Sequence, residues 1–357
     1  MAIRDMSQET TIDRRMERVV RYTKFADNPY GDGGSKRSVQ IKEYWQGKGV
    51  NFVDEKFELP KKYSLIQAIK WCLRAIVFIT KYVGWQTYPR IVDKYKTVLT
   101  YALRLPIIYD KYKGKSVTFL WEYTQDIAPF YLMKAVGAKI IAYPHNLESL
   151  VPTQRDNISH KLAPYWLYEE MERLRMCDEV WAISKEETWL LQLFGINAKY
   201  FPYYPPKSAE TEFLNIKTAR TTQKKESKEF LILGSATNPP TRMGMQELIN
   251  FFGSKSNLSY TIHIGGYKSE TLKYINNTSI VYHGMMSNDE LFDLLVQVDG
   301  IIINQPTTSG ALTRIVENRI AGIPIYANFG AARDFYNLPD VHMYESLEDL
   351  DKMLKSV

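Results

Sequence analysis

Cysteine is scarce in this chain of 357 residues, which holds only Cys72 and Cys177, far apart in the sequence. Two distant cysteines form neither a disulfide framework nor a cysteine-based metal site. The sequence therefore favours a reducing, cytoplasmic location, and no metal is expected to be required. The acids Asp349 and Asp351 lie in a predicted terminal helix and are interpreted as solvated charge.

Long apolar runs are also missing. No stretch approaches the roughly 20 apolar residues that span a bilayer, and the nearest, Ala75–Thr80, is flanked by Arg74 and Lys81. The first fifteen residues lack the apolar core of a secretory signal, so we expect none. Both absences favour a protein that works in the cytoplasm.

The net charge of the chain excludes less than its lack of cysteines and of long apolar runs does. The formal net charge of +6 is modest. It fits a soluble protein, and it also fits attraction to anionic substrates or lipid headgroups. No basic cluster lies on a recognisable reading motif, so nucleic-acid binding is not expected. The G-x-G-x-x-G fingerprint is absent as well, which argues against a dinucleotide-dependent oxidoreductase.

The length and the alternation of strand-like and helix-like segments predict two α/β domains, since single cores rarely exceed roughly 250–300 residues. Residues 205–229 are rich in Lys, Thr, Glu and Ser, which marks an interdomain linker between domains at 16–204 and 230–357. Each domain is expected to be a doubly wound, Rossmann-like sheet, and both to face a central cleft. The predicted strands cover residues 18–26, 50–53, 116–120, 139–143, 179–183, 230–234, 260–264, 280–282, 300–304 and 324–327. The predicted helices include residues 37–46, 63–103, 246–252 and 289–295.

Residues 63–83 mix aromatic and basic side chains with a helical apolar spacing. Core packing is the preferred interpretation of that spacing. The alternative is a basic amphipathic surface that rests on an anionic membrane and admits a lipid-linked acceptor. The apolar positions in question are Ile69, Leu73, Ile76, Ile79 and Val83.

The segment 304–325 is the most informative part of the sequence. A polar, glycine-containing loop follows a buried strand and leads into a helix predicted to begin near Gly310, whose free amides suit a phosphate. Gly310, Arg314 and Glu317 are spaced to share one helical face, with Glu317 about 10 Å along the axis. A nucleotide would then place its pyrophosphate on the loop and its ribose on Glu317. The alternative is a surface helix with a weak Arg314–Glu317 ion pair.

The residues from Thr313 to Ile325, TRIVENRIAGIPI, resemble the donor-site signature of family 4-type glycosyltransferases. That resemblance implies the two-Rossmann fold called GT-B, with Glu317 on the ribose of the donor. It also implies that backbone amides in the turn before the helix hold the diphosphate, at Ser309, Gly310, Ala311 and Leu312. The family has a second glutamate at the position of Ser309, near the donor sugar. Its absence leaves the sugar, the stereochemistry and the activity itself open.

Two further segments of the C-terminal half are similar to the same family. Leu231–Gly244 matches the first strand and loop of its C-terminal domain, where Gly234 allows close approach to a ligand and Arg242 would neutralise phosphate. The alternative for Arg242 is a solvated loop cation. Val281–Leu291 resembles the strand and turn that line the base pocket. His283 would lie in that pocket, or it is an ordinary histidine at a strand end.

In the N-terminal half, Asp27–Ser38 resembles the GG loop of the family, which faces the donor diphosphate. Gly33 and Gly34 would let the backbone approach a ligand at a helix start, although a plain tight turn is the alternative.

The segment Ala142–Ser149 follows a predicted strand, at the point where the family has a histidine before Asn or Asp. His145 would contact the donor sugar or the reacting oxygens, because histidine exchanges protons near neutral pH. Asn146 would line the pocket, and Glu148 is the alternative catalytic carboxylate. A loop-stabilising role is the competing interpretation. Farther along, Ser184 is predicted to cap a helix.

Together these features predict transfer of a hexosyl group from a nucleoside diphosphate sugar, such as a UDP-sugar, to an acceptor hydroxyl in polysaccharide or glycan biosynthesis. The acceptor would be a glycan or lipid-linked glycan, with the protein in the cytoplasm or at the membrane surface. No separate cofactor is expected. Two alternatives stay open: a nucleotide-sugar epimerase or hydrolase, and a non-catalytic subunit that binds a sugar nucleotide or a partner, which Ser309 motivates.

Overall fold

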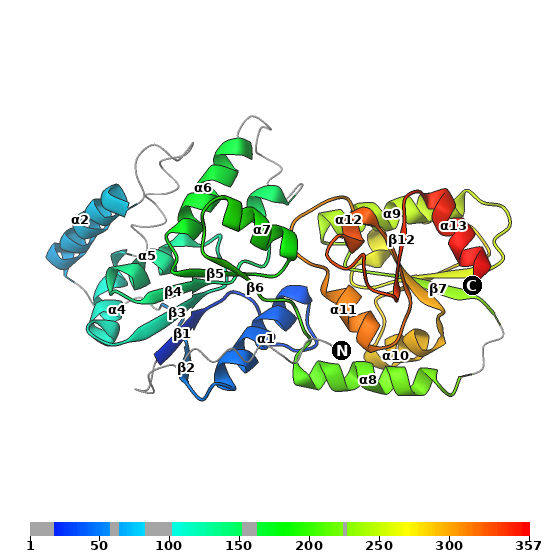
Figure 1. The fold of residues 1–357 in the computed structure, drawn as a ribbon, viewed down its shortest axis with the longest axis horizontal. Coiled ribbons are helices and arrows are strands. Elements are labelled where there is room, and N and C mark those ends of the chain that lie inside the picture. Colours follow the sequence, from blue (N-terminus) through cyan, green and yellow to red (C-terminus); the bar gives the residue numbers. More distant parts are fainter. Residues whose placement is uncertain (1–17, 58–63, 83–101, 152–162, 224–226) are drawn as a thin grey trace. The chain divides into compact units, whose positions relative to one another are not determined.

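Two parallel β-sheets of six strands each form the framework of the protein (Figure 1). The computed structural model describes residues 18–57, 64–82, 102–151, 163–223 and 227–357. The strand orders are β2-β1-β3-β4-β5-β6 and β12-β11-β10-β7-β8-β9. The predicted α/β class with two Rossmann-like, doubly wound sheets is therefore confirmed.

The first sheet is built from short segments rich in β-branched and aromatic residues, and its central strands are the most buried, as expected for parallel strands covered on both faces. Its helices connect parallel neighbours as crossovers. The strands are β1 (Arg18–Tyr22), β2 (Asn51–Asp54), β3 (Val117–Trp121), β4 (Lys139–Ala142), β5 (Glu179–Ala182) and β6 (Ala198–Tyr200). The helices are α1 (Gly33–Gln46), α2 (Leu65–Tyr82), α4 (Leu105–Tyr112), α5 (Ile127–Ala135), α6 (Ala163–Arg175) and α7 (Lys185–Leu193), with the short turn η1 (Glu148–Leu150). The strand β6 was not predicted.

The second sheet separates two apolar clusters, one on each face. The change of strand order between β7 and β10 places the carboxyl ends of these two strands where doubly wound sheets bind ligands. Its strands are β7 (Glu229–Leu233), β8 (Thr261–Gly265), β9 (Ile280–Gly284), β10 (Gly300–Ile303), β11 (Ile325–Asn328) and β12 (Val341–Tyr344). Its helices are α9 (Pro239–Gly253), α10 (Asn288–Gln297), α11 (Thr313–Ile320), α12 (Phe329–Ala332) and α13 (Leu347–Ser356), and the turn η3 (Ser269–Thr271) follows β8.

The described chain divides into two compact units. The first comprises residues 18–24, 42–57, 64–82 and 102–142, and the second comprises 25–41, 143–151, 163–223 and 227–357. Within the second unit, the segment expected to be a linker contains helix α8 (Lys207–Arg220), which packs on α10 and α11. The Arg220 guanidinium donates to the carbonyls at the end of α10, including Leu295 at 2.7 Å. The boundaries at 204 and 230 stay a prediction.

Helix α2 does not pack as the sequence suggested. Ile69 and Leu73, expected in the core, are 52% and 57% exposed. The preferred interpretation of this stripe as core was wrong for these positions, and the buried face is instead formed around Ala75. The side chain of Ile79, and Val83 as a whole, lie outside the described residues. No described helix combines the length and apolar character needed to cross a bilayer.

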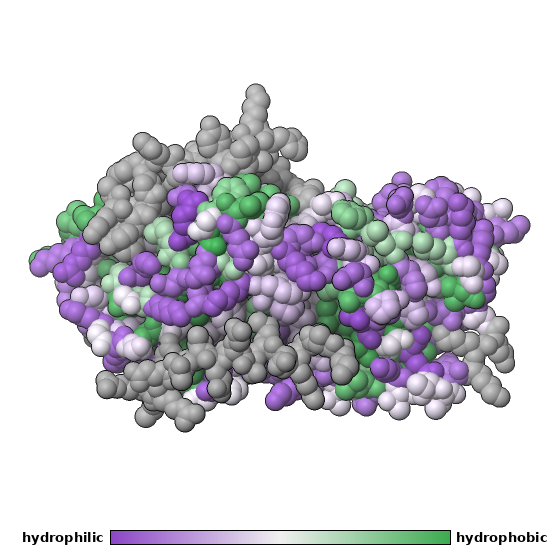
Figure 2. All heavy atoms as spheres, in the orientation of Figure 1, coloured by the Kyte–Doolittle hydropathy of each residue, from purple (hydrophilic) through white to green (hydrophobic). Residues whose placement is uncertain are grey.

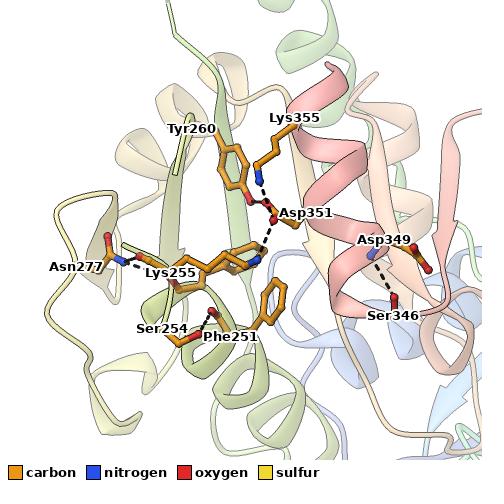
Figure 3. A network of polar contacts seen from close by, with 10 residues as sticks. Phe251, Ser254, Lys255, Tyr260, Asn277, Ser346, Asp349, Asp351 and Lys355 are labelled. Carbon is orange, nitrogen blue, oxygen red and sulfur yellow. Dashed lines mark hydrogen bonds and ion pairs between the residues drawn. The ribbon is translucent and has the colours of Figure 1, made fainter. Parts of the chain in front are cut away.

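The interpretation of Asp351 as solvated charge was also wrong. Its carboxylate is buried and accepts from the Tyr260 hydroxyl at 2.7 Å, from Lys255 at 2.9 Å and from Lys355 at 3.0 Å (Figure 3). Burial alone would raise its pKa, but these three donors outweigh burial and lower the pKa to about 2. The network ties α13 to the end of α9 and to the segment before β8.

Candidate functional site

Two helix starts meet in the second unit. Helix α1 begins at Gly33, and a Cβ at this glycine would lie 3.0 Å from the Thr313 hydroxyl, at the first residue of α11. Leu312 stands at the N-cap of α11 and supplies no side-chain acceptor, so the first amides of that helix lack a capping side chain. The start of α11 therefore offers free amides to an anion, whereas at the start of α1 Asp32 Oδ1 already accepts from the Ser35 amide at 2.8 Å. The GG loop and the turn before α11, separate in the sequence, are thus brought together.

Glu317 lies one turn into α11, and its carboxylate is buried against two donors. Lys36 Nζ, on α1, is 3.0 Å from both carboxylate oxygens, and the Tyr203 hydroxyl donates to Oε1 at 2.7 Å. Burial and the charge of Glu317 raise the pKa of Tyr203. Glu317 therefore lies on the predicted helix, with Lys36 and Tyr203 as its partners, and its role as a ribose ligand stays a prediction. Sequence reasoning missed both partners.

Arg314 supports the loop from inside the protein. Its side chain is half-buried, and the guanidinium donates to the Leu233 carbonyl at 2.8 Å and to the Gln305 side chain at 3.0 Å. Burial lowers the pKa of Arg314 to about 10, so the group stays cationic at neutral pH. Gly234 makes room for it, since a Cβ there would lie 2.8 Å from Nη1. The alternative of a weak surface pair between Arg314 and Glu317 is wrong, because Glu317 is buried and each of the two side chains binds other groups.

Gly310 precedes α11 instead of starting it. Its φ of +81° lies in the left-handed region, and a Cβ would lie 2.0 Å from the Asn146 side-chain oxygen. The expectation that Gly310 shares a helical face with Arg314 and Glu317 was therefore wrong: the chain turns here before the helix begins. Ala311, next to it, packs with Leu312 against the apolar cluster under α11.

The Ser309–Gly310 turn is held by a residue that sequence reasoning missed. Glu187 Oε1, on α7, accepts from the amide of Gly310 at 2.8 Å and from the amide of Leu147 at 2.9 Å. The Ser309 hydroxyl donates to the Leu147 carbonyl at 2.9 Å, and Arg333 donates to the Gly310 carbonyl. The Gly310 amide, predicted to bind diphosphate, thus already binds a carboxyl group.

Glu187 is completely buried, and its second oxygen has no hydrogen-bond partner among the described residues. Burial raises the pKa of Glu187 to about 7, against the opposing effect of the two amides and of Arg333, with Glu170 adding to the rise. The group therefore changes its protonation near neutral pH. Its helix begins with the predicted cap, since Ser184 Oγ accepts from the Glu187 amide at 3.1 Å.

His145 lies beside the GG loop. Its ring stacks on Phe25 with 4.1 Å between centroids, and Gly34 packs on the same phenylalanine, where a Cβ would be 2.5 Å from the ring. Asn146 follows and contacts the Gly310 turn. The Asn146 amide reaches Glu148 only at 3.5 Å, while the Glu148 backbone amide donates to Glu170 at 3.0 Å.

Two predicted donor-binding residues have partners elsewhere. Arg242, exposed on α9, donates to the side chain and carbonyl of Thr271 at 2.7 and 2.9 Å. His283 Nε2 is 2.8 Å from His263 Nδ1, and burial lowers the pKa of both rings, which keeps the pair neutral at pH 7. No described contact joins Arg242 or His283 to the group around Glu317.

A cavity of about 430 Å³ opens at the carboxyl ends of β10, β11 and β12. It is lined by residues 305–307, 328–330 and 343–345, so it adjoins the loop that leads to Gly310. Among the described residues, no group of three or more His, Cys, Asp or Glu side chains could hold a metal ion.

Solved structures share this architecture over nearly the whole chain. Sucrose-phosphate synthase from Thermosynechococcus elongatus matches with a TM-score of 0.61 and 13% identity, covering 95% of this chain and 89% of that one. HepE from Anabaena in complex with UDP matches at 0.60 and 9%, covering 96% and 89%. Trehalose 6-phosphate synthase from Burkholderia multivorans matches at 0.56 and 9%, covering 95% and 88%. No protein-family model and no curated protein sequence matches the chain. The fold is therefore GT-B.

Proposed function

We propose that the protein transfers a hexosyl group from a nucleoside diphosphate sugar to an acceptor hydroxyl, with the donor at the junction of α1 and α11. The observation that carries the proposal is the contact of Gly33 with Thr313, which joins two helix N-termini one turn from the Glu317 carboxylate. A diphosphate fits the helix ends, and ribose hydroxyls fit a carboxylate. Structures of HepE have been solved with UDP and with UDP-glucose, which supports UDP as the first nucleotide to test.

The chemical task of such a site is to stabilise charge on the departing diphosphate. Lys36 suits this task better than Arg242 or Arg314, because its ammonium lies at the helix junction and its partner is a carboxylate that ribose can share. His145, beside the GG loop, would orient the sugar or assist proton transfer. The acceptor we propose is a glycan or lipid-linked glycan, in polysaccharide biosynthesis in the cytoplasm. We propose no metal requirement.

One observation favours a second function, a non-catalytic subunit that binds a sugar nucleotide or a partner. Ser309 replaces the usual glutamate, and the neighbouring Gly310 amide is already bound by Glu187. An enzyme and a binding subunit would both bind a nucleotide, but only the enzyme would release free nucleoside diphosphate when an acceptor is added. An epimerase or hydrolase would instead consume the donor without any acceptor.

The deciding experiment is a calorimetric and thermal-shift screen of the intact protein against UDP, GDP, ADP, dTDP and CMP. A ligand at 100 times its dissociation constant stabilises the fold by about 2.7 kcal/mol. We expect one diphosphate to bind selectively and Glu317→Gln to weaken it, while the exposed Glu348→Gln on α13 leaves affinity unchanged. Binding that is equal in the two variants would remove the ribose assignment, and binding of none of the five would refute the donor site.

A further inference from the structure

Helix α2 presents an apolar stripe that the rest of the described chain leaves uncovered. Five large apolar side chains on this one helix are exposed, whereas no other described helix carries more than two. In Figure 2 an apolar area with a hydrophilic area beside it lies at the left edge, at the place of α2 in Figure 1. The exposed side chains, with their exposed fractions, are Leu65 (76%), Ile66 (68%), Ile69 (52%), Leu73 (57%) and Val77 (65%).

The stripe is continuous along the helix. At 3.6 residues per turn the five side chains fall within an arc of about 120°, and from Leu65 to Val77 they extend over about 18 Å. Ala75 is buried on the opposite side of the helix. The helix therefore rests on the protein by one face and turns a second, apolar face outward. Single exposed apolar residues are ordinary, but a continuous stripe marks an interaction surface.

Charge indicates what covers the stripe. The helix sequence LIQAIKWCLRAIVFITKY contains three basic residues and no acidic one. Lys70 and Arg74 are exposed, and helical spacing places them at about 140° and 180°, directly beside the apolar arc. An apolar face with basic residues at its margin suits the interface of an anionic bilayer, where the side chains enter the acyl boundary and the cations meet headgroup phosphates.

We propose that α2 is a membrane-docking helix that lies in the plane of an anionic lipid surface, with the stripe Leu65, Ile66, Ile69, Leu73 and Val77 inserted and Lys70 and Arg74 against the headgroups. None of the described helices crosses the bilayer in this arrangement. The proposal goes beyond glycosyl transfer, since it requires neither a donor nor turnover. It would hold the protein at a surface from which acceptors with lipid anchors can be reached.

The test is co-sedimentation of the full chain with vesicles of phosphatidylcholine containing phosphatidylglycerol, compared with vesicles of phosphatidylcholine alone. We expect binding to the anionic vesicles that weakens with salt. Ile69→Asp/Leu73→Asp should lower the partition coefficient at least tenfold. The matched control Leu214→Asp/Met243→Asp adds the same charge at exposed apolar positions on α8 and α9 and should bind as the wild type does.

The cations are tested separately. Lys70→Gln and Arg74→Gln should each weaken binding to anionic vesicles about fivefold, with unchanged thermal stability because both residues are exposed. The proposal is overturned if the wild type does not bind anionic vesicles, or if Ile69→Asp/Leu73→Asp binds them as tightly as Leu214→Asp/Met243→Asp does. The proposal is also overturned if light scattering shows that the wild type is a dimer and that Ile69→Asp/Leu73→Asp is a monomer. The stripe would then be covered by a second copy of the chain.

Discussion

Glu187 is the point at which a single substitution tests the described site most directly. One of its oxygens accepts two buried backbone amides, those of Leu147 and Gly310. Glu187→Ala leaves both amides without an acceptor, and each buried unpaired amide costs about 1–3 kcal/mol. We therefore expect the free energy of unfolding to fall by about 2–6 kcal/mol. Denaturant titration at pH 6 measures the loss.

The isosteric change Glu187→Gln tests the charge alone, because the amide oxygen can still accept from both backbone groups. Burial raises the pKa of Glu187 in the folded protein to about 7 from its ordinary value of 4.5, so the neutral carboxyl is the form that the fold favours. Its contribution to stability is complete below about pH 4.5 and is lost as the pH rises through about 7. The full loss corresponds to about 3 kcal/mol.

Titrations of unfolding between pH 5 and pH 8 should therefore show a steeper loss of stability in the wild type than in Glu187→Gln. Burial raises the pKa of Asp334 to about 6, so this residue also makes the protein less stable as the pH rises. Asp334→Asn is the matched variant that removes its contribution to the pH dependence. Equal pH slopes in the wild type and Glu187→Gln would refute the buried-carboxyl argument. Wild-type stability in Glu187→Ala would refute the hydrogen-bond argument.

Two further predictions concern single side chains. His145→Ala should leave nucleotide affinity near normal in calorimetry while turnover falls by about 10²–10⁴, the usual contribution of a general acid–base group; full activity would show that the catalytic placement is wrong. Asp351→Asn should lower stability at pH 7 by about 2 kcal/mol, because it weakens hydrogen bonds to two ammonium groups. Since the folded pKa is lowered from 3.8 to about 2, that difference is present above pH 3.8 and disappears as the pH falls through 2. Asp349→Asn, on the same helix but more exposed, should cost less in the same urea titration, and an equal cost would contradict the buried network.

Local sequence patterns predicted most of the framework. Every predicted strand is present, because buried parallel strands appear as short runs of β-branched and apolar residues whatever their neighbours are. The strands β6 and β12 were missed, since AKY and VHMY are too short and too polar to stand out. Helix α8 was missed for a related reason: its composition is that of a linker, and it is helical because it packs on α10 and α11.

The turns of the site were also visible in the sequence, because glycines before helix starts are local features. Gly33, Gly34 and Gly310 were identified in this way, and the structure brings them within contact of Thr313, Phe25 and Asn146. What each polar group binds could not be predicted. The exposure of the stripe on α2 could not be predicted either. Helical spacing shows that a helix has an apolar face, but it does not show whether the rest of the fold covers that face.

The sequence by itself determined the two parallel sheets, the loop and helix that carry Glu317, and the glycine turns beside them. Only the tertiary structure decided that Lys36, 281 positions away, and Tyr203, 114 positions away, share the Glu317 carboxylate. It also decided that the Glu187 carboxyl group accepts a hydrogen bond from the Gly310 amide. The reason is physical: backbone preferences act between near neighbours in the chain, whereas a buried charge takes its partner from whichever segment the fold brings within 3 Å.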